Sequence, residues 1–455
     1  MTITSRHRRI LAVTTALSLA GAALAVSAPA AEAARPTSTA VLDWNEVAGR
    51  AALAACQAPF DNPLHESRSY TMASLAVHDA LNAIDRRSES YGATFHAPGR
   101  ASVDAAIAAA EHDALVAGFK AATGPFADCA PAGIAIIEDF YAKTVAAIPD
   151  GATKDAGLRT GQRAAAAIIQ MRAHDNSDLT LFDFGYDHGT APGQYQLTPG
   201  YTFAYAEHWA KVTPFSLRRA AQFRSSPPLA LTSTHYARDL NEVKDYGGDG
   251  VTTPTKRTAR QTEAAHFWWE SSPLMWNAIG RTLATTKRLD PWQQARMFSL
   301  LNMALADGYI SVLDEKYHYA YWRPVTAIRA ADTDGNPATT ADPTWTPLEV
   351  TPGIPDYPSG HAIEGGAAAG VFMAYFGTDH IPFSACSVTV TTGDGTCGSA
   401  NPILHHFSSF TDAAAENAVS RVWIGFHFRY ATQQGTSEGL KLGKWTVQHH
   451  LRPTH

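Results

Sequence analysis

Apolar and alanine residues recur at helical spacing over much of this chain, and this periodicity constrains the fold more than any other feature. The pattern runs from Trp44 to about Leu115, and Ala-rich stretches lie at 104–118 and 164–171. Alanine has the highest helix propensity, and a period near 3.6 residues marks the buried face of a helix. Strand-like alternation is scarce. The sequence therefore predicts an all-α fold, a bundle of many helices.

Helical patterns return in the second half of the chain, separated by Pro/Gly-rich segments such as 226–228 and 247–250. They cover 234–246, 258–270, 290–314 and 362–376. The stretch 175–205 shows no periodicity, which predicts a long loop over one face. Ser387–Thr392 is expected to be a short strand or a loop.

The N-terminal segment 1–33 has the pattern of a secretory signal peptide. Arg6, Arg8 and Arg9 precede an uncharged Ala/Leu-rich run, and a small-residue cleavage site follows at 31–33. The alternative is a single membrane anchor, and Sec or Tat export is left open. We expect a signal peptide (1–33), an N-terminal helical part (34–300) and a motif-bearing helical part (301–455), the last two forming one compact unit. The prediction is a secreted protein without a stable membrane span.

The charge balance points away from nucleic acid and anionic membranes as partners. Without residues 1–33 the chain has 33 Lys and Arg against 41 Asp and Glu, a net charge of −8, and no Lys/Arg-rich tract. An acidic chain lacks the electrostatic footprint of a polyanion-binding protein. Any anion site must therefore be a local cationic pocket.

Four cysteines, an even number, favour disulfides in an exported protein. Proximity in the sequence favours the pairs Cys386–Cys397 and Cys56–Cys129. Zinc is disfavoured because neither spacing resembles a paired-ligand site.

The first segment with candidate chemistry runs from Lys316 to Pro324. If it is helical, the seven-residue spacing places Lys316 and Arg323 on one face, and Pro324 ends or bends the helix. Two cations so spaced more often form a solvated face. The aromatic residues between them indicate burial instead, which makes an anionic partner more favourable.

The second segment, Tyr357–His361, precedes the helical run Ala362–Phe376. A helix N-terminus offers free N–H groups to an oxyanion, Gly360 permits close approach, and Ser359 adds a hydroxyl. The alternative is that Ser359 only caps the helix. His361 adds a titratable group that a cap does not need.

The third segment contains Arg421 and His427. Six residues on a regular helix separate two side chains by about 120° in direction. The two residues converge only if the Arg side chain reaches around or the helix is interrupted near Gly425. A lone His in such an aromatic stretch is otherwise a core residue.

Together the motifs K-x6-R-P, P-S-G-H and S-R-x5-H resemble those of the vanadium-dependent haloperoxidases and the related type-2 phosphatidic acid phosphatases. The resemblance covers most of residues 40–450, in segments such as 322–329, 345–352 and 425–431. It implies the helical-bundle fold of that superfamily and vanadate as the cofactor, with hydrogen peroxide and halide as substrates.

The resemblance also implies a role for each motif residue. Lys316, Arg323 and Arg421 would neutralise the equatorial oxygens of the anion, and Ser359 and Gly360 would complete the oxyanion site. His427 would bond to vanadium and His361 would act as the acid–base. All primary ligands would then come from residues after 315, with residues 40–300 supplying the walls.

The alternative is a secreted acid phosphatase with phosphate-ester substrates, in which His427 becomes a phosphohistidine. A non-catalytic oxyanion-binding protein is a third class. Such phosphatases commonly have Asp four residues after the last His, where this chain has Ala431. Halide preference is unsupported, because Ile354, Leu313 and Ala368 stand where halide-oxidising members have aromatic residues or His.

Several further polar residues are expected to be structural. The pairs His405–His406 and His449–His450 resemble exposed pairs, with surface or core roles favoured over metal binding. Arg68 and Asp79 are predicted to form structural polar contacts.

Overall fold

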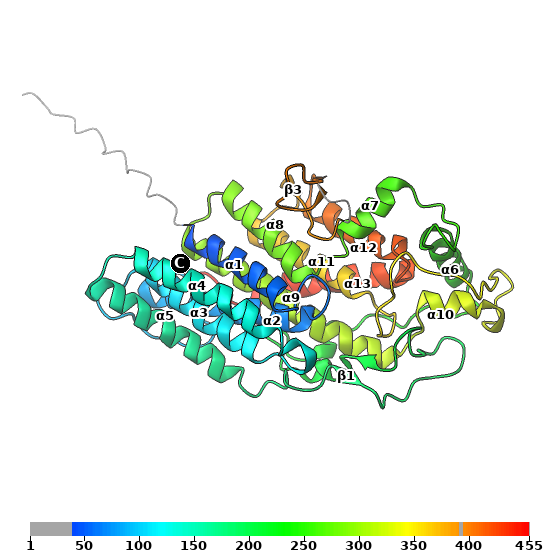
Figure 1. Cartoon of the computed structure of the whole chain (residues 1–455), viewed down its shortest axis with the longest axis horizontal. Helices are drawn as coiled ribbons and strands as arrows, with labels where there is room; N and C mark the ends of the chain where they lie inside the picture. Colours follow the sequence, from blue (N-terminus) through cyan, green and yellow to red (C-terminus); the bar gives the residue numbers. More distant parts are fainter. Residues whose placement is uncertain (1–38, 391–394, 455) are drawn as a thin grey trace, which may run out of the picture. The chain divides into compact units, whose positions relative to one another are not determined.

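The computed structural model describes residues 39–390 and 395–454, and helices dominate their regular structure (Figure 1). The predicted signal segment 1–33 lies outside the described residues. The helices are α1 (Ala40–Ala54), α2 (Pro63–Ile84), α3 (Val103–Lys120), η1 (Gly124–Phe126), α4 (Ala130–Ala147), α5 (Ala152–Met171), η2 (Glu207–Lys211), η3 (Ala220–Phe223), α6 (Thr234–Tyr246), α7 (Ala259–Phe267), α8 (Ser272–Thr286), α9 (Pro291–Tyr319), α10 (Pro324–Arg329), η4 (Ala331–Thr333), α11 (Gly360–Phe376), α12 (Phe410–Trp423) and α13 (Arg429–His449).

The β structure consists of short antiparallel pairs. β1 (Phe182–Asp183) pairs with β2 (Ala204–Tyr205), and β3 (Phe383–Ala385) pairs with β4 (His405–Phe407). The prediction of an all-α multi-helix fold is confirmed. Residues 387–390 form a loop, which agrees with one of the two forms expected for Ser387–Thr392, and 391–392 are not among the described residues.

Local sequence signals explain where the long helices begin and end. Asp290 and Gln293 form a capping box at the start of α9, with Pro291 in the first turn. Helix α11 ends at Gly377, whose φ of 72° is a left-handed conformation that glycine adopts without strain. These signals lie within a few residues of each boundary, so they can be read from the sequence.

Helix α9 packs against both groups of helices in the chain. It contacts α2, which packs on α3 and α5, and it also contacts α11 and α13 (Figure 1). The helix runs through residues 300 and 301, so the expected N-terminal and motif-bearing parts share one element. The largest buried apolar cluster accordingly joins residues of α1–α3, α8, α9 and α11.

Glycines allow α11 and α13 to approach closely. A Cβ built on Gly439 of α13 would lie 2.0 Å from the Ile363 carbonyl oxygen, and one on Gly443 would lie 2.1 Å from that of Ala367. On α11, a Cβ on Gly366 would lie 2.4 Å from the Thr436 carbonyl oxygen. This contact fixes the N-terminus of α11, where the second motif lies.

The aperiodic stretch 175–205 is a long connection whose only strands in the described residues are β1 and β2, of two residues each, as expected of a loop. It is tied to the first motif, because Tyr195 N–H donates to the Ala320 carbonyl (2.6 Å) and Trp322 N–H donates to that of Gly193 (3.1 Å). Loops longer than about 12–15 residues are uncommon within a compact fold, and ordered ones often carry functional residues.

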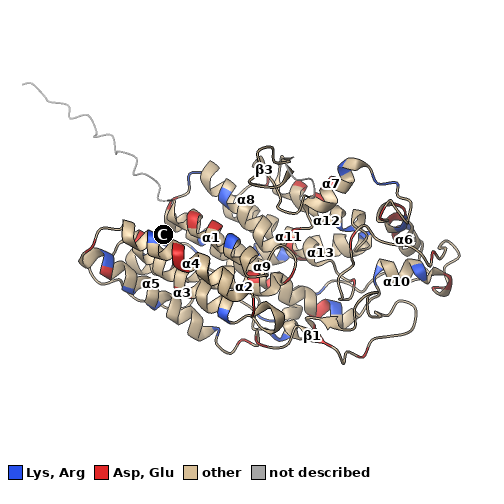
Figure 2. Cartoon of the chain, in the orientation of Figure 1, with Lys and Arg blue, Asp and Glu red and all other residues tan. Residues whose placement is uncertain are grey.

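Both predicted disulfides are present. Cys56–Cys129 links the segment after α1 to the start of α4, and Cys386–Cys397 closes the loop after β3. Among the described residues, no helix is both long and apolar enough to cross a membrane. Acidic and basic residues are interspersed along the helices (Figure 2).

Candidate functional site

Lys316 and Arg323 lie on either side of a break between α9 and α10. The condition under which both would share one helix face is not met: α9 ends at Tyr319, and Ala320 has a φ of 41°. Pro324 disfavours the helical conformation for Arg323, which is extended (φ −79°, ψ 155°), so the proline begins α10 rather than ending α9. Both cations are nevertheless buried, at 1% exposure.

Backbone carbonyls before the second motif hold these two cations. Lys316 Nζ donates to the Pro355 and Asp356 carbonyls, each at 2.8 Å. Arg323 Nε donates to the Ile354 carbonyl at 2.6 Å. The segment 354–356 thus places both side chains beside the start of α11.

Ser359 and Gly360 form the N-terminus of α11, as predicted. Ser359 stands at the N-cap position, but its hydroxyl makes no capping bond, so the alternative that it only caps the helix is wrong. Its Oγ is buried with no hydrogen-bond partner in the described part of the chain. A Cβ on Gly360 would meet nothing nearer than Val312 Cγ1 at 4.0 Å. The helix N-terminus therefore faces open space beside an unsatisfied hydroxyl.

The third segment brings Arg421 and His427 together because α12 ends before His427. Gly425 has a φ of 88°, and the N–H groups of Phe426 and His427 both donate to the Arg421 carbonyl (3.0 and 3.2 Å). The predicted helix interruption near Gly425, one of the two conditions under which Arg421 and His427 could converge, is confirmed. Arg421 Nη1 donates to the Trp268 carbonyl at 2.9 Å, whereas its buried Nε has no partner among the described residues.

Asp356 orients His427, a contact that no pattern in the sequence indicated. Asp356 Oδ1 lies 2.8 Å from His427 Nδ1, and Arg323 Nη1 lies 3.1 Å from Nε2. The carboxylate only accepts and the guanidinium only donates, so the network assigns the proton to Nδ1 and a lone pair to Nε2. Asp356 is fully buried and 71 residues from His427 in the sequence, so local spacing could not reveal the contact.

Burial and mutual repulsion lower the pKa values of the cationic groups in the pocket. Burial, reinforced by Arg323, lowers the pKa of Lys316 well below its ordinary value and that of Arg421 to about 9. Burial and then the neighbouring cations likewise lower the pKa of His427, which keeps its ring neutral. The Asp356 carboxyl offsets at most one of the three cationic charges. A bound anion would relieve both the repulsion and the desolvation.

His361 lies at the same helix start but faces a cavity. The Nε2 atom of His361 is 3.3 Å from the Glu270 carbonyl oxygen. Asn417 Nδ2 donates to the backbone carbonyl of His361 at 3.0 Å. Burial, together with Arg421, lowers the pKa of His361 well below its ordinary value. His361 and Arg421 both line a cavity of about 410 Å³. A neutral imidazole there is placed to accept a proton from a molecule entering the pocket.

The structure thus brings together all seven predicted site residues, from the C-terminal parts of α9 and α12, the segments that follow these two helices, and the N-terminus of α11. The seven are Lys316, Arg323, Ser359, Gly360, His361, Arg421 and His427. Arg323 Nη1 lies 3.1 Å from His427 Nε2, and Ser359 and Gly360 directly precede His361 at the start of α11. Their roles in binding an oxyanion remain a prediction.

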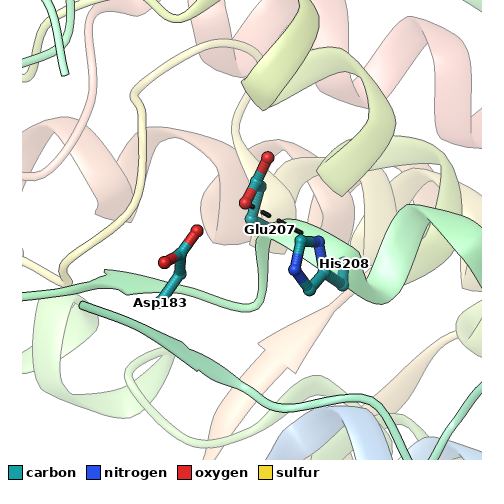
Figure 3. Close-up of side chains that lie close together, drawn as sticks. All are labelled: Asp183, Glu207 and His208. Carbon is teal, nitrogen blue, oxygen red and sulfur yellow. Dashed lines mark ion pairs between the residues drawn. The ribbon is translucent and has the colours of Figure 1, made fainter. Parts of the chain in front are cut away.

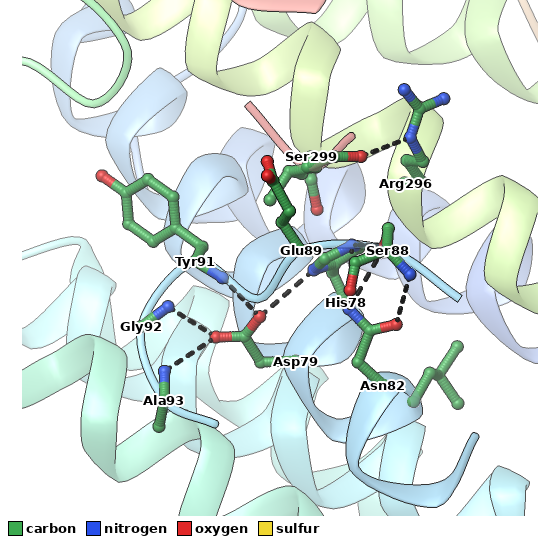
Figure 4. Close-up of polar contacts among 12 residues, drawn as sticks. His78, Asp79, Asn82, Ser88, Glu89, Tyr91, Gly92, Ala93, Arg296 and Ser299 are labelled. Atoms are coloured by element: carbon green, nitrogen blue, oxygen red, sulfur yellow. Dashed lines mark hydrogen bonds and ion pairs between the residues drawn. The ribbon is translucent and has the colours of Figure 1, made fainter. Parts of the chain in front are cut away.

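The residues expected to be structural have structural contacts. Arg68 Nε donates to Asp175 at 2.9 Å, and Asp79 accepts N–H groups from Tyr91, Gly92 and Ala93 (Figure 4). His405 is fully buried and lies 2.5 Å from Glu416, so its expected exposure is wrong. His406 and His449 are exposed.

A separate group of Asp183, Glu207 and His208 lies near β1 and η2 (Figure 3). Lys211 Nζ is 3.3 Å from His208 Nδ1, and the Glu207 carboxylate is 3.6 Å from the same ring nitrogen. Because these partners compete for the ring nitrogen, we assign no metal site to this group.

The fold and the cationic pocket define an all-α protein whose buried site suits a tetrahedral oxyanion. Residues 296–455 match the family model of the VCPO second helical-bundle domain. The vanadium chloroperoxidase of Curvularia inaequalis is 26% identical over 282 residues, an alignment that covers 50% of this chain and 46% of that protein. This chain thus aligns with about half the length of that relative.

Solved structures of similar fold extend the comparison. A bacterial vanadium-dependent iodoperoxidase aligns with a TM-score of 0.73 and 23% identity, over 92% of this chain and 98% of that one. A holo-type bacterial vanadium-dependent chloroperoxidase aligns with a TM-score of 0.67 and 17% identity, over 89% and 95%. The predicted resemblance is confirmed: the chain is similar to the vanadium haloperoxidases in sequence and in fold, and its C-terminal third matches the model of the VCPO second helical-bundle domain.

Proposed function

We propose that the protein is a vanadate-dependent haloperoxidase, which uses hydrogen peroxide to oxidise a halide. The observation that carries the proposal is the arrangement of three buried cations around the neutral Nε2 of His427. The unpartnered Ser359 hydroxyl and the open N-terminus of α11 complete the set of donors. The vanadium haloperoxidase relatives support vanadate as the anion.

The residues fit vanadate by charge and by hydrogen-bonding capacity. A buried polar group without a partner costs about 1–3 kcal/mol, so the Ser359 Oγ and Arg421 Nε favour an occupant that accepts their hydrogen bonds. Lys316, Arg323 and Arg421 would hold its oxygens, and His427 Nε2 would supply the protein's bond to vanadium. When bound, vanadate supplies a Lewis acid that polarises peroxide.

The protein's own contribution is orientation and proton transfer. Asp356 holds the His427 ring so that Nε2 presents a lone pair, as carboxylates commonly do for metal-bound histidines. The three cations stabilise negative charge in a site shielded from water. His361, on the cavity side, takes the proton that peroxide must lose on binding.

The halide is not specified by these residues. Ile354 contributes its carbonyl to Arg323, and Leu313 and Ala368 are buried apolar residues. None of the three provides an aromatic ring or an imidazole for a particular halide. We therefore propose halide oxidation without naming the halide.

One pair of assays separates this function from its rival. A haloperoxidase loaded with vanadate brominates monochlorodimedone only with both bromide and peroxide present. A phosphatase hydrolyses a phosphate ester without vanadate, through a phosphohistidine at His427. Ester hydrolysis without halogenation, tested with iodide as well as bromide, would contradict our proposal. The absence of both activities would indicate a protein that binds an oxyanion without catalysis.

We further propose that the protein is exported, on the pattern of residues 1–33 and the two disulfides, which form in oxidising compartments. N-terminal sequencing of protein from the culture medium tests this proposal. A mature N-terminus near residue 34 is expected, and retention of residues 1–33 in the cell would contradict it.

A further inference from the structure

The connection between α7 and α8 contributes backbone carbonyls to two of the motif residues. The Trp268 carbonyl accepts from Arg421 Nη1 at 2.9 Å, and the Glu270 carbonyl oxygen is 3.3 Å from His361 Nε2. Burial and then Arg421 lower the pKa of His361, and the carbonyls of Glu270 and Trp269 act in the opposite direction. Because a carbonyl only accepts, this contact assigns the proton of the neutral His361 ring to Nε2 and leaves the lone pair on Nδ1.

The two carbonyls are held by different side chains. Trp268 Nε1 donates to the Glu416 carboxylate at 3.0 Å, which anchors the residue that receives Arg421. Glu270 belongs to neither α7 nor α8, so no helix fixes its backbone. The peptide group that carries the Glu270 carbonyl is held at its N–H, which donates from Ser271 to the Pro59 carbonyl at 2.7 Å. On the other side of the carbonyl, the anchor is the Glu270 side chain itself.

The carboxyl group of Glu270 is bound to the loop closed by Cys386–Cys397. Glu270 Oε2 accepts from Ser387 Oγ at 2.6 Å and from the Val388 N–H at 2.8 Å. Burial raises the pKa of this carboxyl to about 7. At about pH 8 it is therefore ionised in most molecules, and hydrogen bonds to a carboxylate are among the stronger ones in proteins.

The same loop also holds the C-terminal end of α7. Thr389 Oγ1 donates to the His266 carbonyl at 2.7 Å, and the Thr389 N–H donates to Ser387 Oγ at 3.1 Å. The Cys397 N–H donates to the Ser387 carbonyl at 3.0 Å, across the loop that the disulfide closes. Consecutive residues of one loop thus anchor the chain at His266 and at Glu270.

We propose that Glu270 is a positioning residue for His361. Its carboxyl group, held by the disulfide-closed loop, fixes the backbone so that the Glu270 carbonyl keeps the His361 ring in the tautomer that accepts a proton at Nδ1. The inference rests on the proposed function, in which His361 takes a proton from peroxide. Because Trp268 has its own anchor, loss of the Glu270 side chain should slow proton transfer more than it weakens anion binding.

Two substitutions of Glu270 and one matched control test the proposal. Glu270→Ala removes the anchor, whereas Glu270→Gln keeps a side-chain oxygen that can accept from Ser387 and Val388. The control Glu111→Ala removes a glutamate of α3 that is equally buried, at 4% exposure, and lies on none of the segments that form the oxyanion site. Thermal unfolding verifies that each variant is folded. If Glu270→Ala does not fold, Ser387→Ala, which removes one of the two hydrogen bonds to Oε2, takes its place.

The imidazole nitrogen shifts of His361, recorded by NMR without vanadate and assigned with His361→Ala, report its tautomer independently of turnover. We expect the Nε2–H tautomer in the unaltered protein, in Glu270→Gln and in Glu111→Ala, and a mixture of tautomers in Glu270→Ala. At saturating vanadate, kcat for iodide oxidation should fall about 10- to 100-fold in Glu270→Ala, the cost of a misplaced reacting group. The vanadate affinity, measured by calorimetry, should stay nearly unchanged.

An unchanged tautomer and an unchanged kcat in folded Glu270→Ala would overturn the proposal. Equal losses in Glu270→Gln, or in Glu111→Ala, would also overturn it, because the hydrogen bonds to Oε2 would then not be the cause. If the unaltered protein oxidises no halide, the proposed function fails, and the nitrogen shifts of His361 alone decide whether Glu270 positions the ring.

Discussion

At the scale of single residues, the state of the site depends on the pair formed by Asp356 and His427. Asp356 Oδ1 lies 2.8 Å from His427 Nδ1, and Arg323 Nη1 lies 3.1 Å from Nε2. Because the guanidinium only donates, Nε2 keeps the lone pair that an axial ligand needs.

Asp356 gives the first prediction. Asp356→Ala removes the acceptor for Nδ1–H, so the ring of His427 is free to place its proton on Nε2, where it blocks the bond to vanadium. We expect vanadate affinity to fall about 10- to 100-fold, as for other carboxylates behind metal-bound histidines. Asp356→Asn, whose side-chain oxygen still accepts, should recover part of the loss.

Two measurements separate this positioning role from a purely structural one. Calorimetry gives the vanadate affinity, and the imidazole nitrogen shifts of His427, recorded by NMR without vanadate, report its tautomer. If Asp356→Ala is folded and leaves both the tautomer and the affinity unchanged, Asp356 does not position His427.

The seven motif residues could be predicted from the sequence because each motif is short and local. The chain breaks that bring the motifs together, at Pro324, Gly360 and Gly425, are also marked in the sequence. Asp356 could not be predicted, because its role arises from a contact across 71 residues.

At the scale of elements, periodicity predicted the long helices well. The expected segments 234–246 and 290–314 correspond to α6 (Thr234–Tyr246) and α9 (Pro291–Tyr319). Whether the helix continues to Arg323 could not be decided from the spacing. The structure ends α9 at Tyr319, and Pro324 begins a new helix. The closeness of α11 to α13 was not predicted, since it depends on which glycines face one another.

The packing of α13 on α11 gives the second prediction. In Gly439→Ala the new Cβ would lie 2.0 Å from the Ile363 carbonyl oxygen, so the helices must separate. Overpacking of this kind costs about 1–3 kcal/mol. Urea unfolding should show the loss, and Ser437→Ala, on the exposed face of the same helix, should show little change. Equal stability of the two variants would mean that the contact does not constrain the helices.

The loop closed by Cys386–Cys397 gives the third prediction. A bridge across 11 residues stabilises by roughly 2–3 kcal/mol on the chain-entropy estimate. The double variant Cys386→Ser/Cys397→Ser should lose about that free energy of unfolding. Thiol titration of the native secreted protein should find neither cysteine reactive, and reactivity of both would remove the basis of the estimate.

At the scale of the whole molecule, buried carboxyl groups make stability depend on pH. Burial raises the pKa of Glu111, on α3, to about 8 from an ordinary value of 4.5. The folded protein therefore holds this proton more tightly than the unfolded chain does. The resulting stabilisation is full below pH 4.5 and is lost as the pH rises toward 8.

Glu111→Gln removes this dependence because its amide does not ionise, which is the fourth prediction. Urea unfolding at a series of pH values between about 5 and 8 should show a shallower loss of stability than in the unaltered protein. Glu46→Gln, an exposed substitution on α1, serves as the control and should keep the original slope. An unchanged slope in Glu111→Gln would contradict the assignment of a buried neutral carboxyl.

The central claim concerns the whole site: His427 holds the vanadium and His361 moves protons. Vanadate binding to the variants His427→Ala and His361→Ala, followed by calorimetry or vanadium NMR, tests it most directly. We predict that His427→Ala loses tight binding and all turnover, because the protein's bond to vanadium is gone. His361→Ala should still bind vanadate while its halide oxidation slows about 10²- to 10⁴-fold, the usual contribution of a general acid–base. Vanadate binding that survives in His427→Ala but is lost in His361→Ala would contradict the account.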